Sequence, residues 1–174
     1  MKKFILKTFG LRKEMGIWFY VSDFLFRKIL RQNSDTSWAI HFTSKIHCPK
    51  NIHRGKNVFP GDSPNNYIDA NNGIFIGDYT NMGPGVGLIS SNHDLIENEK
   101  HLSAKPIRIG KFCWLGMNAV ILPEVELGDF TIVGAGSVVN KSFSSGYCVI
   151  AGNPASLIKQ INEDECRRYA KTRQ

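Results

Sequence analysis

The sequence lacks any stretch of about 18 uncharged apolar residues, so it offers no membrane-spanning helix. Its first residues, MKKFILKTFGLRKEMG, include lysines but not the apolar run and small-residue cleavage site of a signal peptide. CxxC spacing is absent as well. We therefore expect a cytoplasmic protein with four reduced thiols, those of Cys48, Cys113, Cys148 and Cys166.

Acidic residues are fewer than basic ones, 15 against 22, and the excess charge is unevenly placed. Residues 1–31 hold eight Lys and Arg against Glu14 and Asp23, a net charge of +6. Residues 32–158 sum to −1 and residues 159–174 to +2. Nucleic-acid binding would need a basic stripe along the main surface, and the central region has none. We expect no nucleic-acid partner.

Neither a helical nor an alternating-strand period describes the second half of the chain. Instead, an aliphatic residue recurs every six positions and is mostly followed by glycine. A fixed short period of this kind indicates a stacked solenoid. Each six-residue unit would form one face of a triangular prism, and three units would complete a coil of 18 residues. The aliphatic residues expected to point inward are Ile109, Leu115, Ile121, Leu127, Val133 and Val139.

The same period extends back through the first half of the chain, with two weak members, Pro64 and Ala70. From Leu88 to Ile109 the gap is 21 residues, which equals one coil plus three residues. We expect the prism to extrude a loop there, near residues 91–106. This loop is polar and contains two histidines, and a long interruption of a strict repeat is typical of a functional segment. The earlier repeat positions are Ile40, Ile46, Ile52, Val58, Pro64, Ala70, Ile76, Met82 and Leu88.

Three regions are predicted: an N-terminal helical cap (1–35), the solenoid domain (36–155) and a polar helical tail (156–174). Residues 17–30 are apolar over most of a helix circumference, with Arg27 and Lys28 inside the run. Such a helix can cap the open end of a solenoid, as repeat proteins require. Residues 1–31 could instead make peripheral contact with an anionic membrane, at its inner face. We expect capping to dominate, because this run is too apolar to be left in water.

The run IGKFCWLGMNAVILPEVELGDFTIVGAGSVV, followed by VIAGNPASLIK, resembles the hexapeptide-repeat acyltransferases. It is most similar to the maltose, galactoside and xenobiotic O-acetyltransferase branch, over about residues 40–160. The resemblance implies an all-β solenoid, a left-handed parallel β-helix, and the repeat count gives about five coils. It also implies a homotrimer with acetyl-CoA bound between neighbouring subunits.

The resemblance further implies a loop histidine that acts as general base, 17 residues after the Ile of an IGD motif. Here Ile76-Gly77-Asp78 leads to His93 at that spacing. The chemistry suits a neutral imidazole, which can take the proton of a sugar hydroxyl as the oxygen attacks a thioester carbonyl. Asp94, Glu97 or a backbone carbonyl could orient the ring.

Coenzyme contacts follow from the family positions. Trp114 is expected to line the channel between subunits. Met117 stands where related enzymes have Ser, so it would contribute its backbone. Ala135, stacked on Met117, would lie against the pantetheine arm. Asn140 replaces the usual Thr, and Lys159 would lie near the phosphates.

Acceptor contacts in this family come from the coil before the IGD motif, where this sequence reads DSPNNYIDANNG. We select Asn65 and Asn71 there, and add Asp94 beside the catalytic histidine. An asparagine-rich stretch is also typical of any irregular turn.

Metal binding is not expected. His41, His47 and His53 are six residues apart, so they would point to three different sides of the prism. Zinc needs ligands about 2 Å from a common point.

The sequence therefore predicts an acetyl-CoA-dependent O-acetyltransferase acting on a saccharide, such as a surface-polysaccharide precursor. Two alternatives stay open: an N-acetyltransferase acting on an amino-sugar nucleotide, and a non-catalytic trimeric scaffold.

Overall fold

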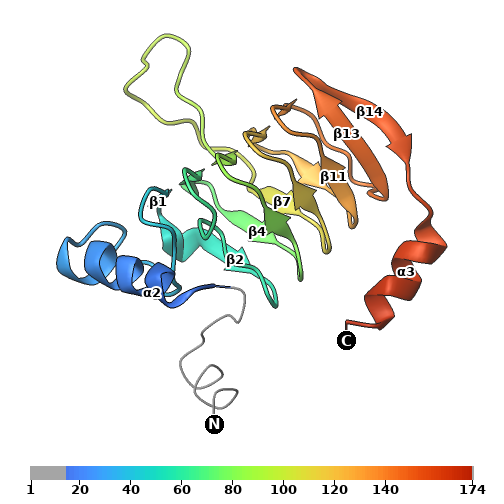
Figure 1. Cartoon of the computed structure of the whole chain (residues 1–174). Coiled ribbons are helices and arrows are strands. Elements are labelled where there is room, and N and C mark those ends of the chain that lie inside the picture. The colour runs from blue at the N-terminus through green and yellow to red at the C-terminus, as the bar shows by residue number, and fades with distance from the viewer. Residues whose placement is uncertain (1–14, 174) are drawn as a thin grey trace.

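The computed structural model describes residues 15–173, in which short strands form three sheets around one core (Figure 1). Over most of its length the chain visits the three sheets in turn, and nearly all pairing is parallel. Sheet A contains β1 (Lys45–His47), β3 (Tyr67–Asp69), β6 (Gly87–Ile89), β9 (Val120–Ile121) and β12 (Val138–Val139). Sheet B contains β2 (Ile52–Arg54), β4 (Ile74–Ile76), β7 (Ile107–Ile109) and β10 (Glu126–Leu127). Sheet C contains β5 (Asn81–Met82), β8 (Trp114–Leu115), β11 (Thr131–Val133), β13 (Cys148–Gly152) and β14 (Ala155–Gln160). The chain is thus a parallel β-solenoid.

The core of the solenoid is filled by the inward aliphatic residues of each strand. They are stacked one above another, so each lies against its counterparts in the neighbouring coils. Burying one such side chain contributes about 1.5–3 kcal/mol, and the stack therefore holds the coils together. Those that are fully buried include Ile68, Leu88, Ile121 and Val139 in sheet A, Ile74 and Ile107 in sheet B, and Leu115, Val133 and Ile150 in sheet C.

The six-residue period is correct in the second half of the chain. Leu127 pairs with Ile109, and Val139 pairs with Ile121, as the period predicts. It is wrong in the first half, where Ile46 pairs with Ile68 rather than with Pro64. The early coils are longer than 18 residues, and Ile68 supplies the inward residue.

The interpretation of the gap after Leu88 as one coil plus three residues is also wrong. β6 in sheet A is followed directly by β7 in sheet B, so residues 90–106 are all inserted between two consecutive faces. The insertion projects away from the solenoid as the predicted loop (Figure 1).

One edge of the solenoid carries a column of aromatic rings in left-handed backbone conformation. Tyr79, Phe112, Phe130 and Tyr147 all have positive φ, and each ring stacks on the next with centroids 5.0, 4.8 and 5.7 Å apart. Tyr169 of α3 (Glu163–Lys171) packs edge-on against Phe112. The C-terminal helix is therefore held against this column.

The C-terminal region differs from the predicted helical tail. Residues 155–160 form β14, which runs antiparallel to β13, and the helix begins only at Glu163. Asn162 caps it, because its side-chain oxygen accepts a hydrogen bond from the Glu165 N–H. A 3₁₀ turn, η2 (Pro49–Asn51), also interrupts the coils.

The N-terminal segment lies at the first coil as α2 (Ile17–Asp23) and a π-helical continuation, η1 (Phe24–Ile29). It contacts the solenoid through Asp23, which is buried, whereas Trp18 is 77% exposed and Phe24 59% exposed. The expectation that this apolar run is buried against the solenoid is wrong for the single chain. The part of the predicted cap in residues 1–14 lies outside the described residues.

Between residues 15 and 173, no helix is long and apolar enough to cross a bilayer.

Candidate functional site

The loop between β6 and β7 is a hairpin held by backbone hydrogen bonds. The backbone N–H of Asp94 donates to the carbonyl of Lys100, and that of Leu102 donates to Asn92, both at 2.8 Å. Asn72 of the coil below fastens the base of the hairpin, since its amide donates to the carbonyls of Ser90 and Leu102, each at 3.0 Å. The loop is thus attached to the outer edge of sheet A.

His93 lies near the base of this hairpin with one ring nitrogen engaged. Its Nδ1 is 2.5 Å from the carbonyl oxygen of Asn98. A carbonyl can only accept, so Nδ1 carries the proton and Nε2 keeps its lone pair. The ring of His101 packs against it, with centroids 4.5 Å apart. The imidazole is therefore held in the tautomer and orientation that a general base requires.

Of the three groups considered for orienting His93, the backbone carbonyl is the one that contacts it. Asp94 instead shapes the loop, because its Oδ1 accepts hydrogen bonds from the N–H groups of Ile96 and Glu97, both at 2.9 Å. These bonds hold the pKa of the Asp94 carboxyl below its ordinary value. Its role as an acceptor contact stays a prediction.

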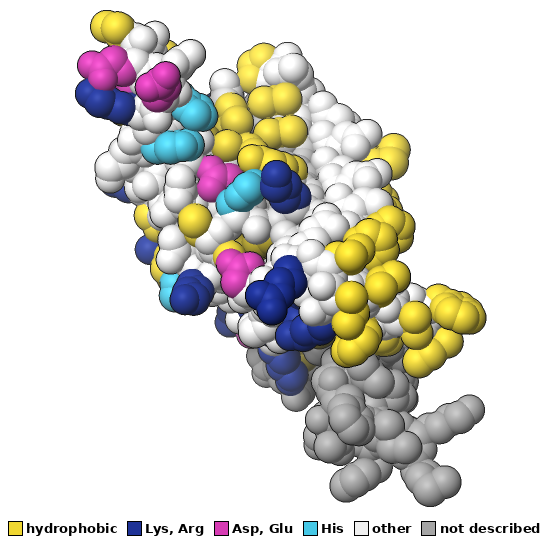
Figure 2. Space-filling view, turned by 90° about the vertical axis from the view of Figure 1, so that its left-hand side faces the viewer, with side chains coloured by type: hydrophobic (Ala, Val, Ile, Leu, Met, Phe, Trp, Pro, Cys, Tyr) yellow, Lys and Arg dark blue, Asp and Glu magenta, His cyan; other side chains and the backbone are white. Residues whose placement is uncertain are grey.

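Asp69 and Ser91 lie together where the loop joins sheet A. The hydroxyl of Ser91 donates to Asp69 Oδ2 at 2.5 Å, and the Asn71 N–H donates to Asp69 Oδ1 at 3.1 Å. His47 of β1 is the neighbour of Asp69 on the adjacent strand of sheet A, because these two residues are paired in register. Figure 2 shows acidic and histidine side chains gathered where the loop meets the solenoid. This cluster is a polar surface at the base of the loop.

The two predicted acceptor asparagines are separated by the width of sheet A. Asn71 lies at the loop edge, where its Oδ1 accepts a hydrogen bond from Cys48 Sγ at 3.2 Å. Asn65 precedes β3 at the other edge, has φ +59°, and donates its backbone N–H to Thr43 Oγ1. The structure therefore places only Asn71 beside the loop.

Asp69 and Ser91 were not selected from the sequence. The signal for Asp69 is its place after Ile68, because alternation along a strand puts the neighbour of an inward residue on the outer face. Ile68 and Ala70 both point inward, so this signal was present in either register, and the selection of asparagines passed over it.

Two of the five predicted coenzyme residues, Trp114 and Lys159, lie on sheet C. Trp114 pairs with Ile132, Ile132 with Val149, and Val149 with Lys159, so Trp114 and Lys159 belong to one continuous sheet. Trp114 and Lys159 are both exposed.

Met117 and Ala135 lie at the corner that follows sheet C. The N–H of Gly136 donates to the carbonyl of Met117 at 2.8 Å, which fits the predicted stacking of Ala135 on Met117. Asn140 follows β12 in sheet A. The predicted coenzyme residues therefore extend from sheet C to sheet A.

Neither the groove along sheet B nor the small cavity beside Asp23 and Phe26, both within residues 15–173, is lined by His93 or the predicted coenzyme residues. The open groove along sheet B is lined by other residues, among them Phe75, Arg108 and Glu126. The His93 loop leaves from the edge of sheet A that adjoins sheet B, whereas Trp114 lies on sheet C. If these residues act together, they do so across an interface between chains.

The three regularly spaced histidines do not converge. His47 packs against Tyr67 and His53 stacks on Phe75. Within residues 15–173, no group of three His, Cys, Asp or Glu could hold a metal ion.

Comparisons with known proteins extend this description. Residues 106–141 match the family model for the bacterial transferase hexapeptide (six repeats). Galactoside O-acetyltransferase of Escherichia coli K12 is 33% identical over 124 residues, which are 70% of this chain and 60% of the relative. The putative colanic acid biosynthesis acetyltransferase WcaF of the same organism is 35% identical over 121 residues, 70% of this chain and 65% of the relative.

A solved structure of galactoside acetyltransferase in complex with coenzyme A superimposes with a TM-score of 0.67. The alignment covers 88% of both chains at 23% identity, so it supports the fold. The chain spans 60% to 65% of the length of the two curated relatives.

Proposed function

We propose that this chain is a hexapeptide-repeat acyltransferase that transfers an acetyl group from acetyl-CoA to a hydroxyl group of a saccharide. The names of the two curated relatives support a saccharide acceptor. The observation that carries the proposal is the His93 Nδ1 contact with the Asn98 carbonyl, which leaves Nε2 free to accept a proton.

The proposed reaction is a direct transfer with His93 as general base. Nε2 takes the proton of the acceptor hydroxyl while the hydroxyl oxygen attacks the thioester carbonyl of acetyl-CoA. The tetrahedral intermediate collapses, the C–S bond breaks, and the new C–O bond remains. The proton on Nε2 then passes to the departing thiolate sulfur. The Asn98 carbonyl stabilises the imidazolium through its bond to Nδ1–H.

We further propose a homotrimer in which the coenzyme lies between neighbouring subunits. The support is the separation within one chain between the His93 loop and the surface that carries Trp114, Met117 and Lys159. A second copy can bring its sheet C toward the loop of the first. Sedimentation equilibrium at micromolar concentration tests this, and a stable monomer would contradict it.

Asp69 and Asn71 are the proposed acceptor contacts. The half-buried carboxylate of Asp69 accepts from Ser91 and Asn71, and its oxygens can accept further hydrogen bonds from sugar hydroxyls. Both residues lie next to the base of the loop that carries His93, so a saccharide held there would be close to the imidazole.

The direct test is an acceptor screen with acetyl-CoA and a panel of saccharides, scored by release of the coenzyme thiol. Cys48 is exposed and would react with a thiol reagent, so a Cys48→Ser background is used. Products are treated with mild base, which cleaves an O-acetyl ester but leaves an N-acetyl amide intact. Base-stable products would favour the amino-sugar acceptor. Absence of acetyl-CoA binding by calorimetry would instead favour a scaffold.

A further inference from the structure

The helical segment 17–30 turns its apolar residues away from the solenoid. We call these residues the exposed apolar face. Figure 2 shows hydrophobic side chains gathered at this N-terminal end of the molecule. A contiguous exposed group of this kind marks an interaction surface more often than an isolated apolar residue does. Its members, between 46% and 77% exposed, are Ile17, Trp18, Val21, Phe24, Leu25, Ile29 and Leu30.

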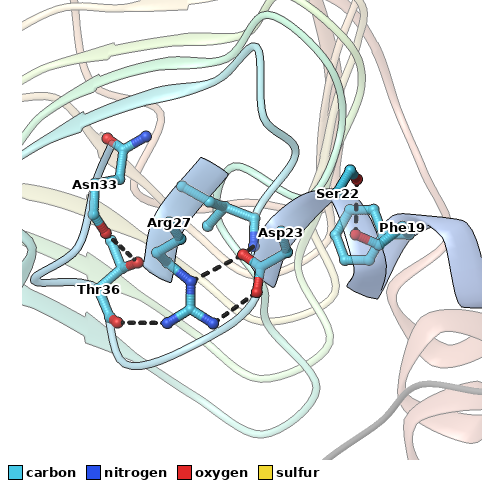
Figure 3. Close-up of polar contacts among 7 residues, drawn as sticks. Phe19, Ser22, Asp23, Arg27, Asn33 and Thr36 are labelled. Atoms are coloured by element: carbon cyan, nitrogen blue, oxygen red, sulfur yellow. Dashed lines mark hydrogen bonds and ion pairs between the residues drawn. The ribbon is translucent and has the colours of Figure 1, made fainter. Parts of the chain in front are cut away.

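This orientation is fixed by polar contacts on the opposite side of the helix (Figure 3). Arg27 donates from Nε to Asp23 Oδ1 at 2.8 Å and from Nη2 to Asp23 Oδ2 at 2.6 Å. Its Nη1 donates to the carbonyl of Thr36 at 3.0 Å. Asp23 Oδ1 also accepts from the backbone N–H of Ile40, the first residue of the inward aliphatic series.

The aromatic contact of the segment lies on the same inner side. The ring of Phe26 stacks on Phe42 with centroids 4.7 Å apart. Rotating the helix to bury the exposed apolar face would break this stack and the buried Asp23–Arg27 pair. The outward orientation is therefore a property of the fold.

Charge distinguishes between the possible occupants of this face. Residues 17–31 contain Arg27, Lys28 and Arg31 against Asp23, which is hydrogen-bonded to Arg27. Lys28 and Arg31 are exposed next to the exposed apolar face. A second copy would bring two segments of net charge +2 together, which is repulsive, whereas an anionic lipid surface attracts them.

We propose that residues 17–31 dock the protein on an anionic membrane surface. The exposed apolar face enters the headgroup region, where Trp and Phe are favoured, and the basic residues contact the lipid phosphates. This attachment is peripheral. It is also independent of the proposed acetyl transfer, because the segment contains none of the proposed catalytic or coenzyme residues.

The test is co-sedimentation of the full-length chain with vesicles of pure phosphatidylcholine or of phosphatidylcholine containing phosphatidylserine. We expect binding to the anionic vesicles at low salt that weakens as salt rises. Trp18→Ser combined with Phe24→Ser should reduce the partition coefficient about tenfold or more, since two large apolar side chains leave the interface. Lys28→Gln combined with Arg31→Gln should reduce it roughly 25-fold, at about fivefold per cation.

Matched controls come from the other end of the chain. Leu157→Ser with Ile158→Ser removes two exposed apolar side chains from β14, and Arg168→Gln with Lys171→Gln removes two cations from α3. Neither control should change vesicle binding. The two N-terminal double variants and the α3 control should keep the wild-type transfer rate on a soluble acceptor, which separates a failure of docking from a failure of the proposed function.

Two results would overturn the proposal. One is absence of salt-sensitive binding to the anionic vesicles. The other is a change of oligomeric state in the Trp18/Phe24 variant with unchanged vesicle binding, which would show that a second copy covers this face.

Discussion

A Cβ atom on Gly116 would lie 2.7 Å from the backbone nitrogen of Ala135 in the next coil. The carbonyl oxygen of Val133 would be equally close, at 2.7 Å. These are backbone atoms of the stacked neighbour, so they cannot move aside as a flexible side chain could. Glycine is thus required here by the distance between coils, at the corner where the coenzyme residues Met117 and Ala135 are predicted.

Gly116→Ala should therefore lower the free energy of unfolding by about 1–3 kcal/mol, the usual cost of overpacking. Urea denaturation measures it. Gly87→Ala is the control, because its added Cβ would meet only ordinary contacts with Val120 at 3.4 Å or more, and it should be neutral or slightly stabilising. Equal urea midpoints for the two variants would show that the distance between coils does not require glycine at position 116.

His93→Ala should lower kcat by roughly 10²–10⁴, the usual contribution of a general base, with little change in acetyl-CoA binding. Asn98→Ala keeps the carbonyl that holds Nδ1 and should remain near wild type. Steady-state kinetics measure kcat, and calorimetry measures acetyl-CoA binding.

Two outcomes would contradict this assignment of roles. If His93→Ala kept more than a tenth of the wild-type rate, His93 would be only a loop residue. If His101→Ala lost as much activity as His93→Ala, the stacked ring of His101 would have a role that the Asn98 contact does not explain.

Asp69→Asn should raise KM for the acceptor and lower kcat/KM roughly tenfold or more, because a hydrogen bond to a charged acceptor is worth about 1.5–3 kcal/mol. The KM for acetyl-CoA should stay unchanged. Asp129→Asn is the control, since this carboxylate also accepts a backbone N–H, from Lys111 at 2.7 Å, but lies at a different corner. An equal effect of the two substitutions would assign Asp69 a structural role only.

The repeat could be predicted where one inward residue per face dominates the pattern. Leu115, Ile121 and Leu127 satisfy this condition, and each is buried as predicted. The prediction failed near Ala70, because both Ala70 and Ile68 point inward from one longer face. A fixed period cannot choose between two inward residues that are two positions apart. The left-handed sense and the coil count stay predictions.

The position of His93 could be predicted from its spacing, but its orientation could not. The Nδ1 contact with Asn98 depends on how the hairpin closes, and that closure is set by backbone bonds such as Asp94 to Lys100. Backbone hydrogen bonds of this kind cannot be predicted from residue type. The outward orientation of the exposed apolar face was not predicted, because it depends on the buried Asp23–Arg27 ion pair. The apolar pattern of the sequence does not indicate that this pair forms.

The cysteines should differ sharply in reactivity. Burial raises the pKa of the Cys113 thiol to about 12, so almost none of it is thiolate at pH 8. Cys48 is exposed. Brief treatment of the native protein with iodoacetamide at pH 8 should modify Cys48 and spare Cys113, as measured by peptide mass spectrometry. The unfolded protein, in which all four thiols react, is the control, and early modification of Cys113 would show that the core opens.

Asp23→Ala should release the N-terminal helix from the solenoid. Asp23 and Arg27 side chains are only 6% and 12% exposed, so removing the carboxylate leaves a buried guanidinium and the Ile40 N–H without their acceptor. Breaking a buried pair in this way costs about 3–5 kcal/mol. Cleavage near residues 17–31 in limited proteolysis should become faster, and the thermal midpoint should fall. Glu163→Ala on α3 removes an i,i+4 pair with Arg167 that is 50–62% exposed and should change neither measurement. If both variants resist protease equally, the buried pair does not hold this helix.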